Sequence, residues 1–245
     1  MINHNPVAIV TGASRGIGAA VACKLAEDGF CVVVNYQNGK DQADSVVATI
    51  EERGGTAIAI QADISNPDQV QGLFEQTKSK FGKVSALVNN AGILEISPFD
   101  QATHEQLTRT FTINTFGVFY AMQQAFKHLE QGGRIVNLTS TTLALNMPGY
   151  GVYNGSKAAV EAFTRVAAKE CRGRRISVNA VAPGPVATEL FLKGKSPEQI
   201  EQFSKMAPLE RLGETDDIAH VVAFLCSSAG GWVNGQVIRA NGGLA

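Results

Sequence analysis

The chain has 245 residues, of which 44% are hydrophobic and 18% are charged, and its formal net charge at pH 7 is -1. This apolar fraction supplies a large core and excludes intrinsic disorder, and the nearly balanced charge gives no reason to expect a nucleic-acid partner. One domain over residues 1–245 is the simplest expectation for an α/β chain of this length.

Targeting and metal signals are weak throughout the chain. The first six residues lack the basic start and apolar stretch of a signal peptide, and no apolar run reaches the roughly 18 residues that span a bilayer. We therefore expect a cytoplasmic protein with no membrane partner. The cysteines form no CxxC pair and the histidines lack metal-ligand spacing, so we expect reduced thiols and no metal site.

The first part of the chain alternates apolar strands with helical patterns. Residues 7–10, 31–34 and 56–60 are short apolar runs that are typical of buried strands. Between them, apolar residues recur at helical spacing over 17–25 and 46–50. Asn66-Pro67-Asp68 then opens a further helix, with proline at its first turn.

The rest of the chain continues this alternation. Strands are predicted over 86–88, 134–138, 176–181 and 236–238, and helices over 105–129, 152–171 and 216–225. Because continuous apolar strands are buried on both faces, we expect a single Rossmann-type, doubly wound α/β domain, with a seven-stranded parallel sheet and helices on both faces. Residues 183–213 form the one long irregular stretch and are predicted to be a substrate lid.

The first strand runs into a glycine-rich turn with the spacing GxxxGxG. Glycine lets a pyrophosphate approach the backbone, and the N-terminus of the following helix attracts its charge. The alternative is an ordinary turn between strand and helix, but the position between a buried strand and an amphipathic helix favours a dinucleotide site. Its predicted residues are Gly12, Ser14, Arg15, Gly16, Ile17 and Gly18.

Further motifs follow the turn in a fixed order, and over nearly the whole chain the sequence resembles the short-chain dehydrogenase/reductase family. The motifs are Asp63-Ile64, Asn89-Asn90-Ala91-Gly92, Asn114, Ser140, Tyr153-Asn154-Gly155-Ser156-Lys157 and Pro183-Gly184. The resemblance implies that Asp63 and Ile64 contact the adenine, that Asn90 and Gly92 flank a ribose, and that Thr188 holds the nicotinamide amide. It also places Ala91, Pro183, Gly184 and Val186 in the cofactor site.

The end of the second strand indicates which cofactor binds. NAD-binding sites of this kind place a carboxylate there, on the ribose 2′-hydroxyl. This chain has Asn35-Tyr36 instead, and Arg15 in the glycine turn can pair with a 2′-phosphate, with Lys40 as a possible assistant. The alternative is that Arg15 is a solvated loop charge. We expect NADP(H).

Tyr153 and Lys157 are four residues apart in a helical pattern and therefore share one helix face. We expect the Lys157 ammonium to lower the pKa of the Tyr153 phenol, so that Tyr153 exchanges a proton with a carbonyl oxygen. Ser140 follows a strand and can donate a hydrogen bond to the same oxygen. The resemblance implies that Asn114 holds a water that links Lys157 to solvent.

Apolar residues after several strands predict a carbonyl or alcohol substrate with an apolar portion. They are Leu94, Ile96, Leu143, Ala144, Leu145, Met147, Tyr150, Phe191 and Leu192. A broad NADP(H)-dependent aldehyde or ketone reductase fits best, because the segment Pro183–Leu192 together with the tail Arg239-Ala240-Asn241-Gly242-Gly243 resembles aldehyde-reductase-like members. One alternative is a 3-oxoacyl-acyl-carrier-protein reductase, for which Lys127, Arg172, Arg174 and Arg175 would dock the acidic carrier protein. Another is a non-catalytic NADP-binding redox sensor.

The helices over 105–129 and 152–171 carry apolar residues on nearly all sides, which is more than one buried stripe requires. A second copy would cover such an outer side, and the last strand offers another contact at the sheet edge. We expect a homotetramer, with a dimer or a monomer as alternatives.

Overall fold

The computed structural model describes residues 5–245, which form a seven-stranded parallel sheet. The strands lie in the order β3-β2-β1-β4-β5-β6-β7, which confirms the predicted sheet and places β7 at one edge. Their bounds are β1 (Val7–Val10), β2 (Cys31–Tyr36), β3 (Thr56–Gln61), β4 (Val84–Asn89), β5 (Leu129–Leu138), β6 (Ser177–Pro183) and β7 (Val237–Ala240).

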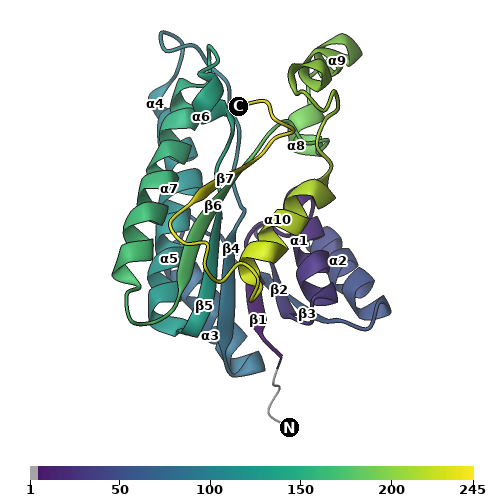
Figure 1. Ribbon diagram of the computed structural model, residues 1–245. Helices are drawn as coiled ribbons and strands as arrows, with labels where there is room; N and C mark the ends of the chain where they lie inside the picture. Colours follow the sequence, from purple (N-terminus) through teal and green to yellow (C-terminus); the bar gives the residue numbers. More distant parts are fainter. Residues whose placement is uncertain (1–4) are drawn as a thin grey trace.

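Helices cover both faces of the sheet (Figure 1). One face carries α1 (Gly16–Glu27), α2 (Lys40–Glu52) and α10 (Thr215–Cys226), and the other carries α3 (Pro67–Phe81), α4 (His104–Phe111), α5 (Gly117–His128) and α7 (Gly151–Glu170). Alternate residues of each strand point to opposite faces, so Ala8 and Val10 enter one core while Val7 and Ile9 enter the other. Among the helices of residues 5–245, none combines the length and apolarity needed to cross a membrane.

The helix predicted over 105–129 is interrupted. Between α4 and α5 lies a π-helical segment, η1 (Thr112–Phe116), and the chain enters β5 already at Leu129. A π-helical turn inserts one extra residue and is frequent at functional sites. Here it contains Asn114, whose side chain is fully buried.

The segment 183–213 is not irregular as predicted. It contains α8 (Glu189–Leu192) and α9 (Pro197–Met206), and α9 begins with a capping box of Ser196 and Gln199. The two ends of the segment meet where Gly213 donates to the Pro185 carbonyl at 2.8 Å and accepts from the Ala187 N–H at 2.8 Å. The segment therefore leaves the sheet and returns to it at one point, and we call residues 183–213 the lid.

The strand order reverses between β1 and β4, which pair directly. The chain winds outward from this point in both directions, so the loops after β1 and β4 diverge and leave a crevice at their carboxyl ends. In open α/β sheets this crevice is where ligands bind. The predicted site residues lie around it.

Candidate active site

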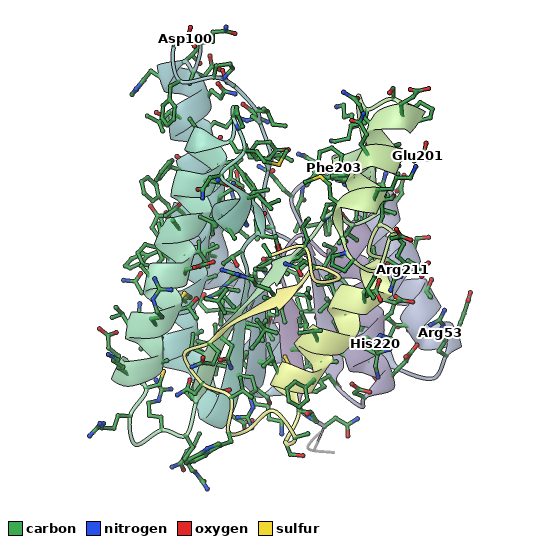
Figure 2. All side chains as sticks on the ribbon, turned by 45° about the horizontal axis from the view of Figure 1, so that its top comes forward. Arg53, Asp100, Glu201, Phe203, Arg211 and His220 are labelled. Carbon is green, nitrogen blue, oxygen red and sulfur yellow. The ribbon has the colours of Figure 1, made fainter. Side chains whose placement is uncertain are left out.

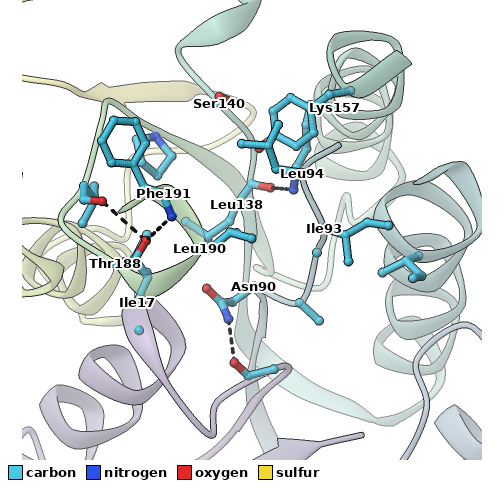
Figure 3. Close-up of a pocket in the computed structure, with 18 of the residues that line it drawn as sticks. Ile17, Asn90, Ile93, Leu94, Leu138, Ser140, Lys157, Thr188, Leu190 and Phe191 are labelled. Carbon is cyan, nitrogen blue, oxygen red and sulfur yellow. Dashed lines mark hydrogen bonds between the residues drawn. The ribbon is translucent and has the colours of Figure 1, made fainter. Parts of the chain in front are cut away.

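A cleft of about 410 Å³ opens at the carboxyl ends of the strands, between the lid and the loops after β4 and β5. Every predicted catalytic or cofactor-binding residue lines it except Gly18 and Asn114. Figure 3 shows Asn90 and Ile17 at its floor, Ser140 and Lys157 on one wall, and Thr188 and Phe191 on the lid side. The structure therefore brings together residues that lie up to 176 positions apart in the chain.

The glycine turn has a shape that fits a pyrophosphate. Gly12 has a left-handed φ of 61°, and a Cβ there would lie 2.9 Å from the Cα of Ala91. Gly18 is buried behind the turn, where a Cβ would lie 2.5 Å from the Gly12 carbonyl oxygen, so it permits α1 to pack closely. The N-terminus of α1 has no side-chain cap, which leaves its first N–H groups available to an anion.

Asn35 has a different position from the one expected. It lies at the edge of the cleft with its side chain buried, and its polar atoms are bonded to the backbone: Oδ1 accepts from the Gly12 N–H at 3.3 Å, and Nδ2 donates to the carbonyls of Ile60 and Ala62 at 3.3 and 3.1 Å. It therefore ties the glycine turn to the end of β3. The exposed residues that line the cleft beyond β2 are Gln37 and Asn38.

Arg15 lies at the mouth of the cleft and pairs with Glu189 of the lid at 3.4 Å. Both side chains are about three-quarters exposed, at 72% and 76%, so the pair is held weakly and can open. Lys40, the expected assistant, pairs instead with Asp44 on its own helix and does not line the cleft.

Tyr153 and Lys157 lie one turn apart on α7, as predicted, with the Lys157 Nζ 6.0 Å from the centre of the Tyr153 ring. Lys157 is buried and donates to the Leu138 carbonyl at 2.9 Å (Figure 3). Burial lowers the pKa of Lys157 to about 8. Since the ordinary pKa is 10.5, burial makes the ammonium less stable relative to the neutral amine than it is in water.

The pKa of Tyr153 moves opposite to the prediction. Burial raises it to about 12; a hydrogen bond with the Ser140 hydroxyl opposes this rise, and the Tyr150 phenol adds to it. Desolvation of the phenolate therefore outweighs the stabilising hydrogen bond from Ser140. Tyr153 is consequently protonated near neutral pH, which is the form that can give a proton to a carbonyl oxygen.

Asn114 lies behind the cleft wall. Its Oδ1 accepts from the Ile93 N–H at 2.8 Å, and its Nδ2 donates to the Ile93 carbonyl at 2.9 Å and to the Ser156 hydroxyl at 3.2 Å. The visible work of this amide is to hold the loop after β4, a role that nothing local in the sequence indicated. It still lies close to the lysine, because a Cβ on Gly92 would be 3.1 Å from the Asn114 Oδ1 and 3.4 Å from the Lys157 Nζ.

The substrate half of the cleft is apolar. Of the predicted lining residues, Leu94, Leu145, Met147, Tyr150 and Phe191 line it, whereas Ile96, Leu143, Ala144 and Leu192 do not. Leu143 and Ala144 line a separate hollow beside β7. Ile93, Ile113, Leu190 and Phe203 also line the cleft, although the sequence did not predict them. Leu190 and Phe203 belong to α8 and α9; the capping box at Ser196 and Gln199 was the signal that would have placed Phe203 on a helix, and α8 is too short to give one.

The lid contributes an aromatic wall. The rings of Phe191 and Phe203 meet edge to face, with centres 5.2 Å apart, and the Lys195 Nζ lies 4.4 Å from the centre of the Phe191 ring. Figure 2 shows Phe203 on α9, at the upper part of the molecule. The aromatic pair and the stacked cation hold α8 against α9.

The basic residues considered for docking a carrier protein lie at the end of the sheet opposite the cleft. Arg172, Arg174 and Arg175 precede β6, and Lys127 precedes β5, so all four are at the amino ends of the strands. Arg174 is also occupied, because it donates to the carbonyls of Phe126 and Leu129 at 2.7 and 3.0 Å. A protein docked there would not present its cargo to the cleft of the same chain.

Comparisons with known proteins cover the whole cleft. A family model described as an enoyl-(acyl carrier protein) reductase matches residues 12–245. The chain is 44% identical over 247 residues to a short-chain type dehydrogenase/reductase of Picea abies, and the alignment covers 97% of this chain and 91% of that protein. It is 43% identical over 251 residues to the NADPH-dependent aldehyde reductase-like protein, chloroplastic, of Arabidopsis thaliana, covering 97% and 93%. Among solved structures, a short chain dehydrogenase from Burkholderia cenocepacia J2315 in complex with NADP has a TM-score of 0.92 at 36% identity, covering 98% and 97%.

Proposed function

The chain belongs to the short-chain dehydrogenase/reductase family and is an NADP-dependent oxidoreductase, and from that premise we propose that it reduces the carbonyl of an aldehyde or ketone to an alcohol. The observation that carries this proposal is the placement of Ser140, Tyr153 and Lys157 on one wall of a cleft whose floor is the glycine turn. A protonated phenol, a hydroxyl and an ammonium at the carboxyl ends of the strands are the groups that carbonyl reduction requires.

In the proposed reaction, bound NADPH supplies the hydride to the carbonyl carbon. Tyr153 gives its phenolic proton to the carbonyl oxygen as negative charge develops there. Ser140 donates a hydrogen bond to the same oxygen and orients it. The Lys157 ammonium, one turn from Tyr153, stabilises the phenolate that remains and is oriented by the Leu138 carbonyl.

The cofactor would lie along the glycine turn, because the left-handed Gly12 and the uncapped N-terminus of α1 form a cradle for a pyrophosphate. Arg15, at the mouth of the cleft, is the cation placed to meet a 2′-phosphate. NADP in the Burkholderia structure and the NADPH dependence in the name of the Arabidopsis relative support this reading.

The substrate is proposed to carry an apolar chain or ring. Among the described residues that line the cleft, the cations are Arg15 in the glycine turn and Lys157 beside Tyr153, whereas Leu94, Met147 and Phe191 are apolar. An apolar half favours uncharged aldehydes and ketones over substrates with a carboxylate beside the carbonyl. The name of the Arabidopsis relative supports an aldehyde among them.

Two other functions are kept as alternatives. A 3-oxoacyl-acyl-carrier-protein reductase would agree with the description of the matched family model. However, the basic residues that would dock the carrier protein lie at the amino ends of the strands, opposite the cleft. A redox sensor that binds NADP without turnover would have no use for Tyr153 beside Lys157. An assay of NADPH oxidation with aldehydes, diketones, quinones and 3-oxoacyl thioesters tests all three functions. If NADPH is oxidised only with the 3-oxoacyl thioesters, the result favours the carrier-protein enzyme. If none of these substrates causes NADPH oxidation, the result favours the sensor.

The assembly is proposed to be a homotetramer, and the location cytoplasmic. Phe116 and Phe119 are each 47% exposed and Val166 is 55% exposed, on helices that contact one another on the same face of the sheet. The rings of Phe119 and Phe163 pack edge to face with centres 5.7 Å apart, so α5 and α7 form one continuous apolar surface. The edge strand β7 supplies the second two-fold contact of the proposed assembly.

A further inference from the structure

A chain of hydrogen bonds leads from Ser140 to Asn154, the residue that follows Tyr153. The Thr142 hydroxyl lies 2.9 Å from the Ser140 Oγ and 2.7 Å from the Asn154 Oδ1. The Asn154 Nδ2 donates to the Thr142 carbonyl at 3.0 Å, and the Thr142 N–H donates to the Ser140 Oγ at 3.2 Å. Thr142 thus contacts Ser140 through both its backbone and its side chain. The side-chain amide of Asn154 in turn contacts both the hydroxyl and the backbone carbonyl of Thr142.

The direction of each proton in this chain follows from the groups involved. The Asn154 amide has only one orientation that lets it donate to the Thr142 carbonyl, so its Oδ1 faces the Thr142 hydroxyl. Because a carbonyl oxygen has no proton, Thr142 must spend its single hydroxyl proton on Asn154. The Thr142 oxygen is then an acceptor toward Ser140 while the cleft is empty, and the Ser140 proton turns from it to a carbonyl oxygen that binds there.

This arrangement fixes the position of the Ser140 oxygen. It accepts from the Thr142 N–H, lies 2.9 Å from the Thr142 hydroxyl oxygen and is hydrogen-bonded to the phenol of Tyr153. An isolated serine would have three staggered rotamers to choose from. Here one rotamer satisfies all three partners.

We propose that Thr142 and Asn154 are positioning residues for Ser140: the amide of Asn154 orients the Thr142 hydroxyl, and Thr142 holds the Ser140 oxygen against Tyr153. Neither residue needs to touch the reacting atoms. The inference rests on the proposed function, because it assigns Ser140 the task of orienting the carbonyl oxygen. The spacing of Tyr153 and Lys157 in the motif gives no role to Asn154, and Thr142 lies outside the motif.

The test compares Thr142→Val and Asn154→Leu with the wild type, in the wild-type and in the Ser140→Ala background. Each variant is expected to lower kcat about three- to tenfold, the size of one lost hydrogen bond, with the Kd for NADPH unchanged in a fluorescence titration. In the Ser140→Ala background neither variant is expected to lower kcat further, because the group they position is gone. Thr142→Ser, which keeps the hydroxyl, is expected to recover most of the loss.

Thr110→Val is the matched control, because the Thr110 hydroxyl is buried without a partner and lies outside the cleft lining. It removes a buried threonine hydroxyl and is expected to leave kcat and the melting temperature unchanged. The proposal would be overturned if Thr142→Val and Asn154→Leu lowered kcat by the same factor in the wild-type and the Ser140→Ala backgrounds. Wild-type turnover by both variants would also overturn it.

Crystal structures give a readout that does not depend on turnover. The wild type is expected to show one Ser140 rotamer, and Thr142→Val a second rotamer populated beside it. A single unchanged rotamer in Thr142→Val would overturn the positioning role whether or not the protein reduces carbonyls. A wild type without carbonyl turnover would instead contradict the proposed function, so the two failures are distinguishable.

Discussion

Arg15 and Glu189 form an ion pair across the mouth of the cleft, with 3.4 Å between the guanidinium and the carboxylate. One residue belongs to the glycine turn and the other to the first turn of α8, so the pair joins the two walls between which a cofactor would lie. If Arg15 binds a 2′-phosphate, Glu189 competes for the same guanidinium.

Glu189→Gln is therefore expected to tighten the binding of NADPH by roughly two- to fivefold, the range of an exposed ion pair, and to leave NADH binding nearly unchanged. Fluorescence titration with both cofactors measures the effect. Glu198→Gln removes the same charge from α9 at another point of the lid and should change neither affinity. Equal tightening for NADPH and NADH would mean that Glu189 does not act through the 2′-phosphate site.

Asn35→Asp tests the position of Asn35 under the glycine turn. An aspartate there would lose both donations to the carbonyls of Ile60 and Ala62 and would place a buried carboxylate against them. We expect the free energy of unfolding to fall by about 2 kcal/mol or more in a denaturant titration. Asn38→Asp, at an exposed position that lines the cleft, should keep wild-type stability and instead weaken NADPH relative to NADH. Stable Asn35→Asp with reversed cofactor preference would contradict the observed position.

The depressed pKa of Lys157 predicts a specific dependence of stability on pH. Its pKa is about 8 in the folded chain and near 10.5 when unfolded, so between these values the unfolded state binds more protons. The stability contributed by this group therefore rises as the pH increases from about 8 to about 10.

Lys157→Met removes the titrating group, and wild type and variant are compared by urea denaturation at about pH 7.5 and about pH 9.5. The wild type is expected to gain stability relative to Lys157→Met at the higher pH. A constant difference between the two proteins across this range would show that the pKa of Lys157 is not lowered.

Phe116→Glu tests the proposed tetramer. Phe116 is 47% exposed in η1, so a charged side chain can be accommodated in the monomer but not in an apolar contact between copies. Light scattering should give a tetramer for the wild type and a smaller particle for the variant. Leu209→Glu, at a lid residue that is 65% exposed, is the matched control and should leave the mass unchanged. A monomeric wild type at micromolar concentration would rule the assembly out.

The glycine turn and the spacing of Tyr153 and Lys157 were predictable because each is local: a few neighbouring residues set the backbone conformation and the shared helix face. The side chain of Asn35 was not, since its partners Ile60 and Ala62 come from the next strand. The same holds for Asn114, whose amide is held by Ile93, 21 residues away.

Two further differences concern periodicity. The π-helical segment around Asn114 covers five residues, too few for a pattern of apolar residues to separate it from an α-helix. In the lid, α8 has only four residues and α9 has a capping box that the prediction did not use. Phe203 was therefore missed, although it faces Phe191 at 5.2 Å.

Tyr153 is the proposed proton donor in an NADPH-dependent carbonyl reduction. The most direct measurement is the rate of NADPH oxidation by wild type and Tyr153→Phe with an apolar aldehyde or ketone, alongside a fluorescence titration with NADPH. We expect turnover by the wild type, and for Tyr153→Phe a loss of kcat of about 10²–10⁴-fold or more with NADPH still bound. Near-native turnover by Tyr153→Phe, with NADPH bound equally well, would contradict this assignment.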